Sequence, residues 1–176
     1  AELFERAYLR GDPEAAARLA RLYFHGHGVK KDPKKAEEYI RLSVEEGSDL
    51  GLVFLGDMLA RGVGREADLK AAADRYRQAA EAGVALGQKR LAEAYAEGKG
   101  VERDQAEAIK WYKLAAVKGN SSAQYRLGRF HETGEGVTEN REEAAKWYRQ
   151  AAAQGEPRSW YRLGKFHESG KGAPMD

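Results

Sequence analysis

Four histidines are the only obvious candidates for catalytic side chains in the sequence. Two of them, His131 and His167, begin similar His-Glu pairs, and such a pair on a helix is half of a known zinc-binding motif. Neither pair has the second histidine that the motif needs, and no third ligand has suitable spacing. His25 and His27 lie in a glycine-rich stretch without further ligands. We therefore expect no metal site and no cofactor.

Other reactive groups are equally sparse. The chain has no cysteine, which excludes disulfides, thiolate zinc sites and cysteine nucleophiles. None of its serines lies in the context of a nucleophile elbow. The Gly-x-Gly pairs, such as Gly26 and Gly28, end expected helices and do not open them, so the helix dipole is oriented wrongly for an anion. These observations predict a protein that is not an enzyme and has no catalytic residues.

One arrangement does suggest binding, a stripe of basic and tyrosine side chains that recurs at helical spacing. We call it the basic stripe, and it consists of Arg18, Arg21, Lys89, Arg90, Tyr125, Arg126, Arg129, Tyr161, Arg162 and Lys165. Phe54 and Asp57 interrupt it. Guanidinium groups bind carboxylates through paired hydrogen bonds, and arginine and tyrosine are enriched among interface anchors. The stripe predicts a groove for an acidic segment of another protein, although a solvated charged face is the alternative.

Composition narrows the choice of partner. The 176 residues include 30 lysines and arginines against 28 aspartates and glutamates, a net charge of +2, whereas nucleic-acid binders usually carry a strong basic excess. No apolar run approaches the ~20 residues that cross a bilayer. We therefore expect a protein or peptide partner, no nucleic acid and no membrane insertion. Nothing in the sequence indicates the compartment, so periplasm, secretion and cytoplasm all stay open.

The residues of the basic stripe belong to a sequence that repeats with a strict period of 36 residues. One glycine column consists of Gly11, Gly47, Gly83, Gly119 and Gly155, and one leucine column of Leu19, Leu55, Leu91, Leu127 and Leu163. No insertion or deletion interrupts either column. Fixed periods of 20 to 50 residues are typical of solenoids and arrays, in which each unit buries its apolar face against its neighbours.

Each unit contains the signals for two helices. Asp12, Ser48 and Asn120 share the column that precedes the first helix, which we expect over about 13–25 in the first full unit, ending at a Gly-x-Gly pair. The second helix begins after the column of Asp32, and Glu107 and Glu143 complete capping boxes in two units. Trp147 and Tyr148 resemble a binding pair, but their periodic recurrence favours core packing.

The sequence thus predicts one all-α domain, a right-handed superhelix (solenoid) of 36-residue helix-turn-helix repeats. The units are 1–11 (the second helix of a partial repeat), 12–47, 48–83, 84–119, 120–155 and 156–176 (the first helix of a partial repeat).

The repeat resembles that of the Sel-one-like repeat (SLR) family, relatives of the tetratricopeptide repeat. The unit that ends at Gly155 carries the resemblance most closely, through Ala123, Leu127, Gly128, Gly134, Gly136, Val137, Ala144, Trp147, Tyr148, Ala151, Ala152 and Gly155. The second unit departs from the family pattern, with Leu59 for tyrosine, Arg65 for valine, Arg75 for tryptophan and a valine displaced to Val63. The resemblance implies a bacterial adaptor or scaffold without catalytic activity.

Both ends of the sequence fall inside a repeat, which suggests a segment of a longer array. The closing helix around Trp160 is expected to be able to stack on the opening helix around Phe4 of a second molecule, head to tail. We therefore expect a protein-interaction scaffold that binds an extended or acidic segment in its concave groove. A structural spacer between domains of a larger protein is the main alternative, and a cell-wall-ligand binder or hydrolase is a further one.

Overall fold

Every regular element of the described chain is an α-helix. The computed structural model describes residues 2–62 and 66–168. These residues form ten helices, which are α1 (Glu2–Tyr8), α2 (Pro13–His25), α3 (Pro33–Glu45), α4 (Asp49–Arg61), α5 (Leu69–Glu81), α6 (Ala85–Glu97), α7 (Gln105–Val117), α8 (Ser121–Thr133), α9 (Arg141–Ala153) and α10 (Pro157–Glu168). The expected all-α repeat superhelix is confirmed. Val63, Arg65 and the residues after 168 lie outside the described part.

The helices begin where the sequence places side-chain oxygens. The Asp12 carboxylate accepts hydrogen bonds from the backbone N–H groups of Glu14 and Ala15, and Asp32 does the same for α3. Such a cap satisfies amides that have no partner inside the helix, and replacing one with alanine costs about 1 kcal/mol. Helix α6 is the exception in its column, because Val84 precedes it and offers no side-chain cap.

The first helix of each full repeat ends at a glycine in the left-handed region. The backbone φ is 77° at Gly26 and 70° at Gly134, values that other residues adopt only with strain. Only one of the two hydrogen bonds of each expected capping box forms, the one that the cap side chain accepts. The N–H groups of Glu107 and Glu143 donate to their caps, whereas the two carboxylates form ion pairs with lysines three residues along the helix.

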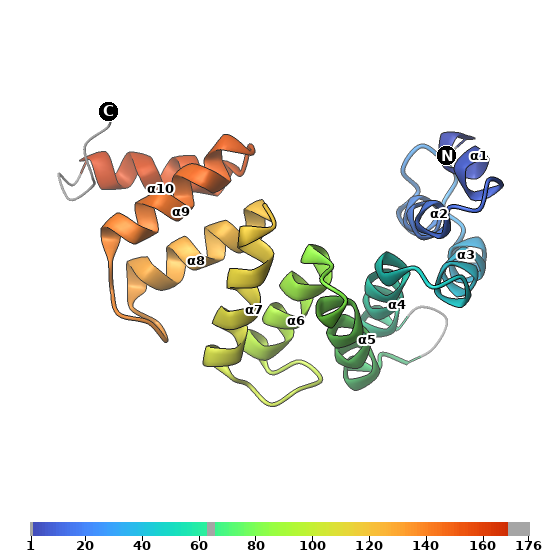
Figure 1. Ribbon diagram of the computed structural model, residues 1–176, viewed down its shortest axis with the longest axis horizontal. Coiled ribbons are helices and arrows are strands. Elements are labelled where there is room, and N and C mark those ends of the chain that lie inside the picture. Colours follow the sequence, from blue (N-terminus) through green and yellow to red (C-terminus); the bar gives the residue numbers. More distant parts are fainter. Residues whose placement is uncertain (1, 63–65, 169–176) are drawn as a thin grey trace.

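The helices follow an open arc, with α1 and α10 at its opposite tips (Figure 1). Each second helix packs on the first helix of its own repeat, as in the pairs α2–α3, α4–α5, α6–α7 and α8–α9. The first helices also pack on one another across repeats, α2 on α4 and α4 on α6. Because elements approach most closely on the inner side of a curved stack, we call the surface formed by α2, α4, α6, α8 and α10 the inner face.

The core is built from the periodic columns. Leu19, Leu91 and Leu127 are fully buried, and so is Tyr148, while Trp147 is half-buried and packs against a core cluster shared by its own repeat and the preceding one. The interpretation of Trp147 and Tyr148 as core residues is therefore confirmed. Alanines fill much of the space between helices, so neighbouring backbones lie close together and large aromatic rings fill the remaining gaps.

Candidate protein-binding surface

Two buried tyrosines on second helices connect to the inner face through carboxylates. The Tyr76 hydroxyl on α5 donates a hydrogen bond to Asp57 on α4 at 2.8 Å, and Arg90 on α6 binds the other carboxylate oxygen at 2.9 Å. Burial, followed by the charge of Asp57, raises the pKa of Tyr76, so this phenol stays protonated and is available as a donor. Asp57 therefore joins both helices of its own repeat to the first helix of the next one.

The fourth full repeat contains the same connection, with the tyrosine and the arginine from the same columns and the carboxylate from a different one. The Tyr148 hydroxyl on α9 donates to Glu132 on α8 at 2.5 Å, and Arg162 on α10 lies 3.3 Å from the second oxygen of that carboxylate. Burial and this hydrogen bond raise the pKa of Tyr148. Arg129 approaches the same carboxylate at 3.7 Å. Glu132 thus neutralises two arginines of the basic stripe.

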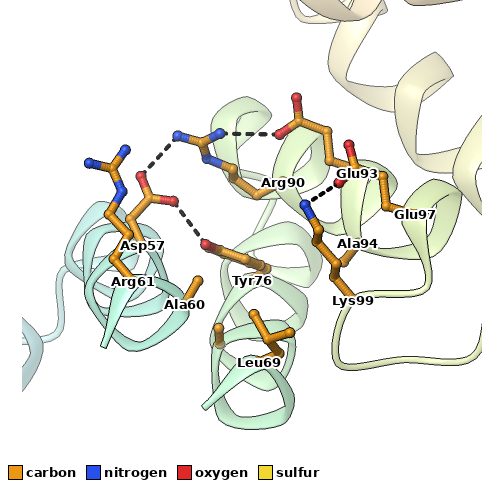
Figure 2. Close-up of a pocket in the computed structure, with 11 residues that line it drawn as sticks. Asp57, Ala60, Arg61, Leu69, Tyr76, Arg90, Glu93, Ala94, Glu97 and Lys99 are labelled. Carbon is orange, nitrogen blue, oxygen red and sulfur yellow. Dashed lines mark hydrogen bonds and ion pairs between the residues drawn. The ribbon is translucent and has the colours of Figure 1, made fainter. Parts of the chain in front are cut away.

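A polar pocket of about 330 Å³ lies beside the first of these connections, between α4, α5 and α6. Figure 2 shows Arg90 held between Asp57 and Glu93, with Tyr76 reaching the same aspartate. The other charged side chains of the pocket are Arg61, Glu97 and Lys99, of which the last two form an ion pair. The pocket combines charges of both signs, so it lacks the excess positive charge that would attract an acidic ligand.

The third full repeat lacks this connection. Tyr112 takes the position of Tyr76 and Tyr148, but Ala96 stands where Glu132 lies one repeat later, and Glu93 is already paired with Lys89 and Arg90. Arg126 on α8 is exposed, and no carboxylate within the described residues pairs with it. Its charge acts on Tyr112, whose pKa is raised by burial and partly lowered by Arg126. Among the described residues, Arg126 is thus an exposed cation that no carboxylate neutralises.

The remaining members of the basic stripe fall into different environments. Arg18 pairs with Glu14 at 2.8 Å, whereas Arg21 lies over the ring of Phe54, 5.5 Å from its centre. Lys165 lies over the ring of Tyr161, which is 60% exposed. The structure therefore leaves Arg21, Arg126 and Lys165 without a carboxylate partner among the residues it describes.

Tyr125 differs most from the sequence-based expectation. We expected this tyrosine on the exposed face, but only 7% of it is exposed, because its ring packs against Tyr148 and lies under the Arg158 guanidinium at 4.4 Å. We also did not expect Asp57 and Glu132 as partners of the stripe. The two acids occupy different columns of the repeat, so periodicity gave no signal for them.

The histidines are spread over the molecule. His131 is half-buried on α8 and His167 is exposed on α10, whereas His25 and His27 stack on each other with ring centres 5.2 Å apart. Burial and the nearby charge of Arg61 lower the pKa of His25. In residues 2–62 and 66–168, no three His, Asp or Glu side chains are placed to hold a metal ion together, and no helix is long and apolar enough to cross a membrane.

Comparisons with known proteins agree with this architecture. The family model for the Sel1 repeat matches residues 13–48, 50–84, 85–120, 121–156 and 158–176. A protective antigen of uropathogenic Escherichia coli with an SLR fold is 34% identical, with a TM-score of 0.81 over 96% of this chain and 36% of that protein. This chain therefore spans about a third of that relative. No protein of curated function is similar enough to count as a match.

Two further solved structures extend the comparison. A Sel1 repeat protein from Oxalobacter formigenes is 30% identical, with a TM-score of 0.81 over 94% of this chain and 67% of that one. The immunity protein Pa5087 of Pseudomonas aeruginosa is 26% identical, with a TM-score of 0.71 over 92% and 60%. The chain belongs to the Sel1 repeat family, whose members generally serve as non-catalytic scaffolds for interactions between proteins.

Proposed function

We propose that this chain binds an extended, acidic segment of a partner protein along its inner face. The observation that carries the proposal is the state of Arg126. The arginines one repeat before and one repeat after it, Arg90 and Arg162, are neutralised by carboxylates, whereas Arg126 is exposed and unpaired within the described residues. A guanidinium group in this state binds a carboxylate without first breaking an internal ion pair.

The surroundings of Arg126 suit a peptide. Tyr161 and Lys165 on the next first helix lie in neighbouring columns of the basic stripe, and Tyr161 is largely exposed. The first helices succeed one another along the arc, so a segment lying across them contacts several repeats in turn. The immunity protein among the similar structures is compatible with a protein partner, although its name does not identify the partner of this chain.

The direct test is to measure binding of a fluorescent ten-residue peptide of alternating glutamate and alanine by anisotropy. We expect Arg126→Ala to weaken binding roughly tenfold, since a charge-assisted hydrogen bond contributes about 1.5 kcal/mol. Arg129→Ala should have a smaller effect, because Arg129 lies near Glu132. Neither change should lower the melting temperature by more than 1–2 °C, roughly the effect of a surface substitution of up to 0.5 kcal/mol.

The matched control is Arg149→Ala, which removes the same charge from an exposed position on the second helix α9. Arg149→Ala should leave the affinity within about twofold, since screened surface charges contribute little at 0.15 M salt. Equal losses in the Arg126 and Arg149 variants would show that the peptide senses only net charge. No measurable binding to the wild type would instead favour a structural spacer.

The terminal helices support a second candidate interaction, the head-to-tail stacking of two copies. Leu3 on α1 is 79% exposed, and Trp160 on α10 is 62% exposed. Helix α10 is of the first-helix type and α1 of the second-helix type, so the two would complete a repeat between molecules. Light scattering across a hundredfold range of concentration should show growing species, and Trp160→Lys should suppress them. A mass that stays monomeric throughout would refute stacking.

A further inference from the structure

An apolar cavity of about 340 Å³ lies between α3 and α4. Its apolar wall consists of Ile40, Val44, Leu55, Met58 and Leu59, and charged side chains of α3 complete the lining, namely Glu37, Arg41 and Glu45. Apolar cavities of this size are large enough for an aromatic group, because even ~150 Å³ of enclosed apolar space binds benzene.

In the third and fourth full repeats, a tryptophan packs against the residues equivalent to this cavity wall. Two repeats later, Trp147 packs against the core cluster formed in part by Ile109, Tyr112, Ala116, Leu127 and Phe130. These five residues follow Glu37, Ile40, Val44, Leu55 and Met58 by 72 positions each, as Trp147 follows Arg75. One repeat later, Trp111 packs against the cluster that contains Tyr76, Ala80 and Leu91, the equivalents of Ile40, Val44 and Leu55.

The residue that should fill the cavity is missing. The equivalent of both tryptophans in the second full repeat is Arg75, whose guanidinium donates to Gln78 on its own helix at 2.9 Å. Arg75 does not line the cavity. The space between α3 and α4 is therefore the one that an indole ring occupies in the next two repeats.

We propose that this cavity receives the indole side chain of a tryptophan from a partner protein. The walls provide the apolar contacts that an indole needs, and the Arg41–Glu45 ion pair, at 3.0 Å, lies in the polar part of the lining. The cavity shares no residue with the basic stripe. It is a second contact point, independent of the acidic segment proposed above, and buried aromatic anchors of this kind often dominate binding energy.

The first measurement uses N-acetyl-tryptophanamide as a probe and the methyl resonances of ¹³C-labelled methionine as the readout. The chain has only two methionines, Met58 in the cavity wall and Met175 near the end of the sequence. We expect a saturable shift of the Met58 methyl signal with no shift of the Met175 signal. N-acetyl-alaninamide should shift neither signal, and N-acetyl-phenylalaninamide should bind at least threefold more weakly.

Substitutions at Arg75 provide the decisive comparison. Arg75→Trp supplies the missing ring from within the chain, so it should abolish the Met58 shift and raise the melting temperature. Arg75→Gln removes the charge but leaves the cavity open, so it should retain the shift. If Arg75→Trp does not fold, Val44→Phe fills the cavity from α3 and should also abolish binding.

Three results would overturn the proposal. They are no saturable shift in the wild type, an undiminished shift in the filled variant, or equal affinity for the phenylalanine derivative. None of these results depends on the acidic peptide, so failure here is distinguishable from failure at Arg126.

Discussion

A glycine that lies under a tyrosine ring offers the sharpest test of the packing. A methyl group added at Gly128 on α8 would lie 2.5 Å from the Tyr148 ring, far inside normal contact. The ring cannot move away freely, because its hydroxyl is bonded to Glu132. Gly56 has the same relation to Tyr76, which is bonded to Asp57. The third full repeat has Ala92 in this column, and its tyrosine lacks the carboxylate of the other two repeats.

The expected cost of Gly128→Ala follows from three contributions. The added methyl group gains about 1 kcal/mol of helix propensity. Overpacking costs roughly 1–3 kcal/mol, and weakening the hydrogen bond to an ionised carboxylate costs about 1.5 kcal/mol more. The free energy of unfolding should therefore fall by about 2 kcal/mol. In a chain of this size, that lowers the melting temperature by roughly 4–8 °C.

Gly164→Ala is the matched control, because Gly164 lies in the same column of α10 and no atom lies near its added methyl group. It should leave stability unchanged or raise it by up to ~1 kcal/mol. Urea unfolding followed by circular dichroism measures both variants. In a Tyr148→Phe background, the cost of Gly128→Ala should shrink by about 1.5 kcal/mol, since the hydrogen bond is already lost. Equal stabilities for the two glycine variants would refute this account of the packing.

Three further predictions concern the carboxylate connections. The folded protein holds the pKa of Tyr76 and of Tyr148 above the ~10 of an unfolded chain, so its stability should be complete below pH ~10 and decline above it. Urea midpoints at pH 8 and pH 11 should show a smaller decline for Tyr148→Phe. Asp57→Ala leaves Arg90 and the Tyr76 hydroxyl without this partner, so calorimetry should show that the free energy of unfolding falls by about 2 kcal/mol. The stability of Asp57→Asn should lie between that of Asp57→Ala and that of the wild type. Ala96→Glu places a carboxylate where Glu132 lies one repeat later, so that it can pair with Arg126. This variant should have a higher melting temperature and weaker binding of the acidic peptide. Unchanged affinity would contradict the role of Arg126.

The sequence predicted the helices well because their ends depend on local chemistry. Helix α2 runs over Pro13–His25, as expected from Asp12 at its start and Gly26 at its end. Caps and left-handed glycines act within one turn of chain, and the strict period repeats each signal several times. The core followed from the same columns, since the leucine column recurs every 36 residues and three of its members, Leu19, Leu91 and Leu127, are fully buried.

The candidate binding surface was predictable only in part. Projection at helical spacing found Arg126 and Tyr161, which are exposed, but also Tyr125, which is buried under the Arg158 guanidinium of α10. Ion pairing depends on the full set of neighbours in space, and those neighbours come from columns that do not align. Asp57 and Glu132 perform the same function three positions apart within the repeat, so no periodic pattern indicates either of them.

Departures from the period therefore underlie both proposed contacts. Where the repeats agree, as in the column of Leu127, the side chain packs in the core. Where one repeat differs, a group that the others satisfy internally is left for something outside. Ala96 leaves the Arg126 guanidinium without the carboxylate that Arg162 has, and Arg75 leaves an indole-sized space that Trp147 fills elsewhere. Both proposed contacts thus follow from the same physical cause, the removal of one internal partner from an otherwise regular array.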